Sequence, residues 1–355
     1  MHVLITGHLG YIGPVMIHTF KEAGHFVTGL DTGYFRECVD PVESPIAPDR
    51  EIFRDIRNVQ AKDLEDVDAV MHLAALSNDP LGQLDQELTL QINFQATAAV
   101  ARLAKERGVG RFVFASSCSL YGAADGADAP LAEGSPFNPV SAYAISKVRT
   151  EEALRVLADE NFSPVFLRNA TAFGGSPRMR FDLVLNNLMG WARTTGTVRV
   201  LSDGKPWRPL VHIEDIALAA LCAVQAPREA VHNEAFNIGR EDCNFRIHEI
   251  AEATARQVRG AEIVITGETA GDLRSYRVDF TKALTGLPGF APSWTLAKGC
   301  AELDQWFDRH PKISSETIGD RHYVRLKQLC YLIERRDIDE RLFWRELAGT
   351  EELGR

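Results

Sequence analysis

A tyrosine and a lysine four positions apart, Tyr143 and Lys147, are the pair whose spacing points most directly to chemistry. On a helix these positions share one face, and a neighbouring ammonium lowers the pKa of a phenol so that the phenol can act as a base. Ser117 follows the apolar run Arg111–Ser116, and its hydroxyl can hydrogen-bond a reacting oxygen. The Tyr-x-x-x-Lys pattern alone is a common surface pairing, so its meaning depends on its surroundings.

Three glycines, Gly7, Gly10 and Gly13, follow the strand-like run Val3–Thr6 and open a helical pattern. At this spacing, the first glycine permits a tight turn, the second lets the backbone approach a diphosphate, and the third lets the helix pack closely. The N-terminus of the helix then faces the anion. A glycine-rich turn without a ligand is the alternative interpretation.

A carboxylate follows at the position that a dinucleotide site requires. Asp31 ends the next strand-like run, about twenty residues beyond the glycines, where a carboxylate hydrogen-bonds the hydroxyls of the adenosine ribose. It would repel the 2′-phosphate of NADP, and the nearest arginine, Arg36, lies beyond Thr32–Phe35. The pattern therefore favours NAD, with a turn-capping aspartate as the alternative.

The elements that must position these residues alternate through the first half of the chain. Strand-like runs lie at Val3–Thr6, Phe26–Leu30, Ala69–Ala75, Arg111–Ser116 and Pro164–Asn169. Helical periodicity covers Ile12–Ala23, Leu88–Glu106 and Ala142–Leu157. This alternation predicts an α/β fold, a Rossmann doubly wound parallel sheet with helices on both faces.

The second half is less regular, with glycine and proline at Gly174–Pro177 and again at Asp203–Pro206. We predict a smaller, interleaved C-terminal substrate lobe and a helical C-terminal extension. The predicted bounds are 1–173 for the NAD-binding Rossmann domain, to which part of 205–240 returns, 174–310 for the substrate-binding lobe and 311–355 for the extension.

The extension is highly charged, and its apolar residues are spaced for one helix face in Arg321–Arg336 and Asp339–Leu347. Such helices would cover the substrate lobe or a partner subunit, or simply pack with one face in solvent.

Composition excludes several classes of protein. A formal charge of -10 argues against a nucleic-acid or membrane-surface protein. No run approaches the roughly twenty apolar residues that span a bilayer, so we expect a cytoplasmic protein. The six cysteines are scattered singly and the histidines form no HxxxH pair, so structural thiols and the absence of a metal site are expected.

Taken in order, the motifs resemble those of the extended short-chain dehydrogenase/reductase superfamily, in particular its nucleotide-sugar epimerases and dehydratases. The resemblance reaches about residue 310. The matching positions are the glycine motif Thr6–Gly13, Asp31, Asp55 with Ile56, His72–Ala75, Asn93, Ser116 with Ser117, Tyr121 with Gly122, Tyr143, Lys147, Arg208, His212, Asp215 and Phe236–Gly239.

The resemblance implies NAD as the cofactor, a nucleoside-diphosphate sugar as the substrate, and Ser117, Tyr143 and Lys147 as the catalytic residues. It also implies a homodimer that pairs through the helices at 88–106 and 142–157. The implied cofactor contacts are Gly7, Gly10, Tyr11, Ile12, Gly13, Asp31, Asp55, Ile56, Ala74, Ala75, Asn93, Ser116, Tyr143, Lys147 and Ala170. The implied substrate contacts are Ser117, Ser119, Thr171, Asn187, Arg208 and Arg274.

The positions after Ser117 separate the chemistries within this superfamily. Relatives that eliminate water place Asp-Glu there, decarboxylases place Glu and 3,5-epimerases place Cys at position 119, whereas this chain has Cys118-Ser119. We therefore expect a 4-epimerase that oxidises C4 transiently and returns the hydride, with a keto-reductase or dehydrogenase as the alternative and a non-catalytic NAD-binding sensor as a further one. Thr171 replaces the usual sugar-contacting Asn, and Thr269–Asp272 replaces a usual Arg-x-Gly-Asp, so Arg274 and Arg277 become candidate substitutes.

Overall fold

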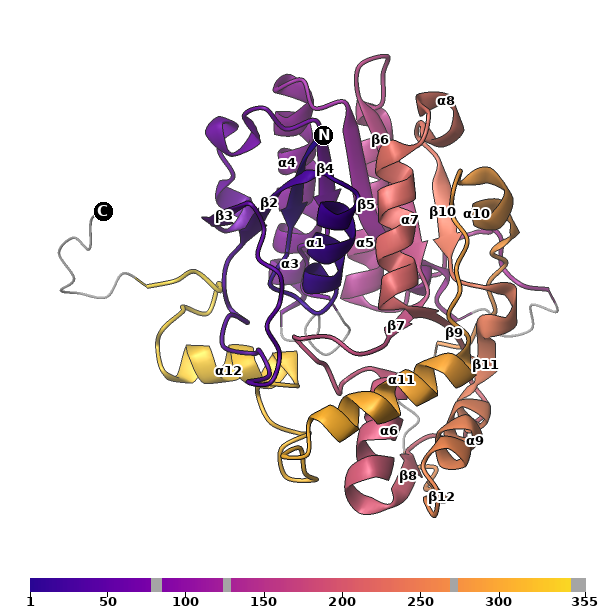
Figure 1. Ribbon diagram of the computed structural model, residues 1–355. Coiled ribbons are helices and arrows are strands. Elements are labelled where there is room, and N and C mark those ends of the chain that lie inside the picture. The colour runs from indigo at the N-terminus through magenta and orange to yellow at the C-terminus, as the bar shows by residue number, and fades with distance from the viewer. Residues whose placement is uncertain (78–84, 124–128, 269–273, 346–355) are drawn as a thin grey trace.

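A seven-stranded sheet forms the centre of the computed structural model, which describes residues 1–77, 85–123, 129–268 and 274–345 (Figure 1). The strand order is β10-β6-β5-β4-β1-β2-β3, and every neighbouring pair is parallel. The strands are β1 (His2–Thr6), β2 (Phe26–Asp31), β3 (Arg50–Phe53), β4 (Ala69–His72), β5 (Arg111–Ser117), β6 (Ser163–Asn169) and β10 (Ala235–Ile238).

Helices cover both faces of this sheet, because successive apolar residues of each strand point to opposite sides. Val3 and Ile5 pack in one cluster with Met16, whereas Leu4 packs in another with Val100. The first face carries α1 (Gly13–Glu22) and α7 (Ile213–Gln225), and the second carries α4 (Thr97–Glu106) and α5 (Ala142–Leu157). The predicted α/β Rossmann class is confirmed.

In the first half of the chain, two predicted elements differ from the observed ones by more than one residue at an end. The helix expected at Leu88–Glu106 is α3 (Gln86–Leu90), a π-helical turn (Gln91–Ala96) and α4. The π turn contains Asn93, whose buried amide exchanges hydrogen bonds with the backbone of Leu76 at 2.8 and 3.1 Å. The strand β4 stops at His72 rather than Ala75 because His72 pairs with Thr6, the last residue of its neighbour β1.

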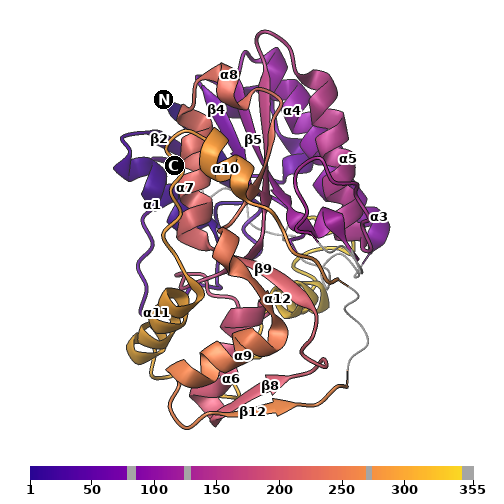
Figure 2. The same ribbon diagram turned by 90° about the vertical axis from the view of Figure 1, so that its right-hand side faces the viewer.

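The smaller lobe lies beyond the carboxyl ends of the strands (Figure 2). Leu188, Ile250 and Trp306 belong to its separate apolar core. It comprises α6 (Val184–Thr195), β8 (Thr197–Val200), α9 (Ile247–Gln257), β12 (Glu262–Ile265) and α11 (Leu296–Arg309), with β8 and β12 paired in parallel. A three-stranded sheet at the junction contains β7 (Thr171–Phe173), β9 (Trp207–His212) and β11 (Asn244–Arg246).

The chain returns to the large sheet more than once after it first enters the lobe. After β9 it forms α7, the short α8 (Arg228–Val231) and β10, and after β12 it forms α10 (Thr281–Gly286), which packs on β10. The lobes are therefore interleaved in sequence, while the residue bounds predicted for them stay a prediction.

Over its described residues, 311–345, the C-terminal extension contains one helix, α12 (Arg325–Glu334), at the side of the molecule that carries β2 and β3 (Figure 1). The helix predicted at Asp339–Leu347 is wrong over 339–345, where a turn is closed by a bridge between Ile338 and Trp344. A carboxylate oxygen of Asp339 accepts hydrogen bonds from the backbone of Arg341 and Phe343 at 2.9 and 2.8 Å, and such local bonds compete with a helix. Residues 346–347 lie outside the described part.

The extension covers both halves of the molecule rather than the substrate lobe alone. Ile318 and Tyr323 pack against the core of the lobe, whereas Leu329 and Leu332 pack in the cluster on one face of the large sheet. Within the described residues, no helix is long and apolar enough to cross a membrane.

Candidate active site

A cavity of about 930 Å³ lies at the carboxyl ends of β1, β2, β5 and β6 and extends into the smaller lobe. Its walls include every predicted catalytic, cofactor and substrate residue except Asn93. Asn93 lies behind the wall, where it holds the backbone of Leu76. It positions the segment after β4 instead of facing the cavity.

The glycine turn is the most tightly constrained part of this wall. Gly7 has a φ of 75°, and a Cβ there would lie 2.7 Å from the backbone nitrogen of Ala74. A Cβ on Gly13 would lie 2.0 Å from the carbonyl oxygen of His8, whereas one on Gly10 would meet only the Gly7 oxygen, at 3.1 Å. The bare backbone at the start of α1 therefore forms a cradle that suits the diphosphate of a dinucleotide.

Asp31 is fixed at the edge of the same cradle. Its carboxylate accepts backbone hydrogen bonds from Leu9 at 3.0 Å and from Gly33 at 2.8 Å, and further lone pairs remain for ribose hydroxyls. The guanidinium of Arg36 lies 5.0 Å from the centre of the Phe53 ring. These contacts suit an adenosine ribose with a free 2′-hydroxyl, so the residues present fit NAD.

Tyr143 and Lys147 lie in the first turns of α5, whose N-terminus is capped by the Ser141 hydroxyl. The Lys147 ammonium donates to the Ala115 carbonyl at 2.7 Å and lies 5.4 Å from the centre of the Tyr143 ring. Burial lowers the pKa of Lys147 to about 7, although the carboxylate of Glu151 acts in the opposite direction. The helix thus places a phenol and a buried amine on one face, as their spacing predicts.

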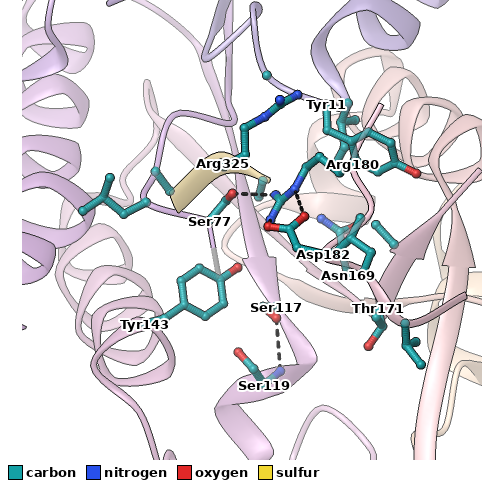
Figure 3. A pocket seen from close by; sticks show the side chains of 18 of the residues that line it. Tyr11, Ser77, Ser117, Ser119, Tyr143, Asn169, Thr171, Arg180, Asp182 and Arg325 are labelled. Atoms are coloured by element: carbon teal, nitrogen blue, oxygen red, sulfur yellow. Dashed lines mark hydrogen bonds and ion pairs between the residues drawn. The ribbon is translucent and has the colours of Figure 1, made fainter. Parts of the chain in front are cut away.

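The hydroxyls of Ser117 and Ser119 lie at and just beyond the end of β5, on the same side of the cavity view as Tyr143 (Figure 3). The hydroxyl oxygen of Ser117 accepts a hydrogen bond from the backbone of Ser119 at 3.1 Å. The side-chain oxygen of Ser119 is buried without a hydrogen-bond partner among the described residues. The thiol of Cys118, in contrast, points away and donates to the Arg168 carbonyl at 3.1 Å. Burial raises the pKa of this thiol, which supports a structural role for Cys118.

A buried network fixes α5 relative to the strands. The Arg168 guanidinium on β6 binds both carboxylate oxygens of Glu151, with distances of 3.0 and 2.7 Å. The Ser116 hydroxyl donates to Glu151 at 2.6 Å, and Tyr121 bridges Arg168 to the side chain of Asn237 on β10. Because Ser116 precedes Ser117 and Glu151 lies one turn beyond Lys147, this network sets the distance between the two halves of the catalytic set.

The predicted substrate residues line the far end of the cavity. Arg208 on β9 donates to the carbonyls of Trp207, at 2.8 Å, and of Arg274. The side chain of Asn187 donates to the Phe181 carbonyl at 2.7 Å, and Thr171 lies on β7. Arg277, the other predicted substitute, is not among the residues of the cavity wall; its guanidinium carbon lies 5.3 Å from the centre of the Trp207 ring. The segment Thr269–Asp272 lies outside the described residues.

Several wall residues escaped the sequence analysis. Asn169, at the carboxyl end of β6, has a buried side-chain oxygen without a partner among the described residues, and the rule that ligands bind at these strand ends was the available signal. Arg180 binds Asp182 through two nitrogens at 2.8 and 2.9 Å and donates to the Ser77 hydroxyl at 2.9 Å (Figure 3). Arg180 and Asp182 lie in an irregular segment of the sequence, where no motif indicates a role in a binding site.

Comparison with known proteins agrees with this geometry. The profile of the NAD dependent epimerase/dehydratase family matches residues 3–239, which is more than half of the chain. The chain belongs to this family. It is an NAD-dependent enzyme of the nucleotide-sugar epimerase and dehydratase type, and the alternative of a non-catalytic sensor is set aside.

The alignment of this chain with named relatives covers nearly the whole length of those relatives. A UDP-glucose 4-epimerase of Bacillus subtilis is 25% identical over 86% of this chain and 96% of its own. A UDP-glucose 4-epimerase of Mycolicibacterium smegmatis is 29% identical over 86% of this chain and 98% of its own. Among solved structures, MoeE5 in complex with UDP-glucose and NAD has a TM-score of 0.74 at 26% identity, with 88% and 100% of the two chains covered.

Proposed function

We propose that this enzyme is a nucleotide-sugar 4-epimerase that inverts the configuration at C4 of a nucleoside-diphosphate sugar. The observation that carries the proposal is one cavity lined by the glycine cradle, by Ser117 and by the pair of Tyr143 and Lys147. NAD supplies the acceptor and donor for the hydride of the sugar carbon. The relatives named UDP-glucose 4-epimerase support this reaction, at 25% and 29% identity.

The roles of the residues follow from their positions. The Tyr143 phenol exchanges the proton of the C4 hydroxyl, and the Ser117 hydroxyl donates a hydrogen bond to the same oxygen as it becomes a carbonyl. Lys147, held by the Ala115 carbonyl, supplies positive charge beneath the Tyr143 ring. Proton transfer by the phenol must accompany both oxidation of C4 and its reduction, so one residue serves both directions.

The carboxylates in the cavity wall argue against elimination of water. Such a reaction needs a general acid besides a base, and the residues after Ser117 are Cys118, whose thiol points away from the cavity to the Arg168 carbonyl, and Ser119. The carboxylate of Asp182 lies in the cavity wall, and the guanidinium of Arg180 helps hold its pKa below the ordinary value. An ionised Asp182 has no proton to donate to a leaving hydroxyl.

The test is incubation of the purified enzyme with UDP-glucose, and separately with UDP-galactose, without added cofactor. We expect both reactions to approach the same mixture of the two C4 epimers, followed by NMR or anion-exchange chromatography. The same assay is then run with UDP-N-acetylglucosamine and UDP-glucuronic acid to find the preferred sugar. A reaction that requires stoichiometric reduced cofactor would instead indicate the keto-reductase or dehydrogenase alternative.

A second measurement separates hydride return from proton exchange at other carbons. In deuterium oxide, a 4-epimerase of this type incorporates no solvent deuterium at the carbon atoms of the sugar, because the hydride never exchanges with water. Deuterium at C3 or C5 of the product would contradict the proposal, because it would require removal of a carbon-bound proton. Substrate deuterated at C4 must yield an epimer that keeps the label.

We also propose that the enzyme is a homodimer that pairs through the helical segments at 88–106 and 142–157, which contain α4 and α5. Val156, the penultimate residue of α5, is 84% exposed, which is a high value for an apolar side chain. Light scattering of the purified protein tests this directly. Val156→Lys should shift a dimer towards monomer, and a monomeric wild type would contradict the proposal.

A further inference from the structure

Three buried arginines, Arg178, Arg180 and Arg325, gather beside the cavity. Their exposed fractions are 5%, 5% and 1%, and Arg180 and Arg325 form part of its wall (Figure 3). In the described part of the chain, the carboxylate of Asp182 is the only one within ion-pair distance of any of the three. Arg178 and Arg325 therefore make no direct ion pair among the described residues, and only the more distant carboxylates of Asp31 and Glu51 act on Arg178 and that of Asp182 on Arg325. Buried charges in proteins are normally paired directly.

Arg325 is the most deeply buried of the three. Its guanidinium donates to the carbonyls of His322 at 2.9 Å and Arg178 at 2.7 Å, and it lies 4.9 Å from the centre of the Phe35 ring. Carbonyl groups and an aromatic ring satisfy N–H groups but carry no formal negative charge. Burial lowers the pKa of Arg325 to about 10, as expected for a cation whose solvent has been removed without an anion in its place.

Contacts of the C-terminal extension place this cation at the cofactor half of the cavity. The Gln328 amide donates to the Tyr34 carbonyl at 3.0 Å, and the Trp344 indole donates to the Thr32 carbonyl at 2.7 Å. Both carbonyls belong to the segment directly after Asp31, the residue that suits the adenosine ribose.

The other two arginines show which part of the cavity the cluster occupies, between the adenosine end and the catalytic end. Arg178 lies within electrostatic range of Asp31, and Arg180 lies within range of Tyr143. Arg325 interacts electrostatically with both arginines. The cluster therefore spans the interval between the adenosine end and the catalytic end, and the part of NAD that occupies such an interval is its diphosphate.

We infer that Arg325, supplied by the C-terminal extension, binds the diphosphate of NAD opposite the N-terminus of α1. Each phosphate carries one negative charge and supplies a direct ionic partner to Arg325, which lines the cavity and has no carboxylate within ion-pair distance among the described residues. A guanidinium suits a phosphate because its N–H groups bind two oxygens at once. The inference rests on the NAD dependence of the family and is independent of which sugar the enzyme uses.

The test compares Arg325→Gln, which keeps N–H donors but removes the charge, with Lys327→Gln on the exposed side of the same helix. NAD content is measured by chromatography of the material that denaturation releases from the purified protein, and NAD affinity by titration calorimetry after the bound cofactor is removed. Arg325→Gln should bind NAD roughly 10- to 100-fold more weakly, the range for a charge-assisted hydrogen bond. Lys327→Gln should match the wild type.

The affinity for UDP-glucose, measured on the same proteins, distinguishes the two diphosphates that the cavity is proposed to hold. Arg325→Gln should leave it unchanged, because Arg208 and Arg274 line the other end. Wild-type NAD affinity in Arg325→Gln, or a loss confined to UDP-glucose, would overturn the inference. Because NAD content requires no turnover, a failed epimerase assay would leave this result intact.

Circular dichroism shows whether the Gln variant folds. If it does not, Arg325→Lys provides the test, because it keeps the charge and the apolar stem. A single ammonium lacks the planar fork, so this variant should bind NAD several-fold more weakly than the wild type. Equal affinity would overturn the inference.

Discussion

Glu151 and Arg168 form a buried ion pair, with exposed fractions of 1% and 2%, that joins the catalytic helix α5 to strand β6. The Ser116 hydroxyl donates to the same carboxylate. Through Ser116, Glu151 connects the helix that carries Tyr143 to the strand β5 that carries Ser117. A substitution at Glu151 therefore affects the positions of both catalytic residues.

Glu151→Gln should lower the free energy of unfolding by about 3–5 kcal/mol, because the buried Arg168 charge would lose its partner. Glu152→Gln, the exposed neighbour, should have almost no effect. Urea unfolding followed by circular dichroism measures both. Equal stability of the two variants would mean that the ion pair contributes little net free energy.

Tyr143→Phe should reduce kcat by about 10²- to 10⁴-fold, the usual contribution of a positioned general acid or base. NAD content should stay near the wild-type value, because the phenol hydroxyl is not part of the glycine cradle. Tyr331→Phe, far along α12, serves as the matched control. A variant that keeps wild-type turnover would exclude Tyr143 as the proton-transfer group.

The pH dependence of stability should report the burial of Lys147. In the unfolded chain its pKa is the ordinary 10.5, and in the folded, cofactor-free protein it is about 7. Between these values the unfolded state binds more protons, so Lys147 makes the free energy of unfolding rise with pH from about 7 to 10.5.

Lys147→Met removes this contribution, and its unfolding free energy should therefore rise less steeply over the same interval. Lys62→Met, at an exposed site, should keep the wild-type slope. Urea titrations of the cofactor-free proteins at several pH values between 7 and 10 measure the slopes. Parallel curves for wild type and Lys147→Met would show that the amine is not desolvated.

Gly13→Ala should destabilise the protein by about 1–3 kcal/mol or more, the range for overpacking, because the new methyl would collide with the His8 carbonyl. It should also purify with less NAD, since relief of the collision moves the start of α1. Gly110→Ala is the control, because nothing lies within 4 Å of a Cβ there. Normal NAD content in Gly13→Ala would show that the turn tolerates a side chain.

The parts of the site that could be predicted from the sequence depend on local spacing. Gly7, Gly13, Tyr143 and Lys147 lie in short motifs whose geometry is set by one turn or one helix. Ser117 could be placed as well, because the carboxyl ends of parallel strands meet at one edge of a sheet. For the same reason the strand-like runs predicted the α/β class.

The parts that escaped prediction depend on packing between distant segments. Arg325 donates to the Arg178 carbonyl 147 positions away, and nothing in its own neighbourhood distinguishes it from the solvent-exposed Lys327. The segment after Asp339 has helical periodicity, yet the Asp339 side chain bonds the backbone locally. Helical periodicity also does not reveal the π turn around Asn93, which forms where the amide reaches Leu76.

The repeated return of the chain to the large sheet means that neither half of the molecule is a contiguous stretch of sequence. A fragment ending at residue 173 would lack α7 and β10, which cover one face of the sheet and pair with β6. It would expose the apolar residues under α7 and leave β6 as an open edge, a template for aggregation. A fragment that ends at residue 173 is therefore expected to aggregate, and an excised NAD-binding half must include the later segments that form α7 and β10.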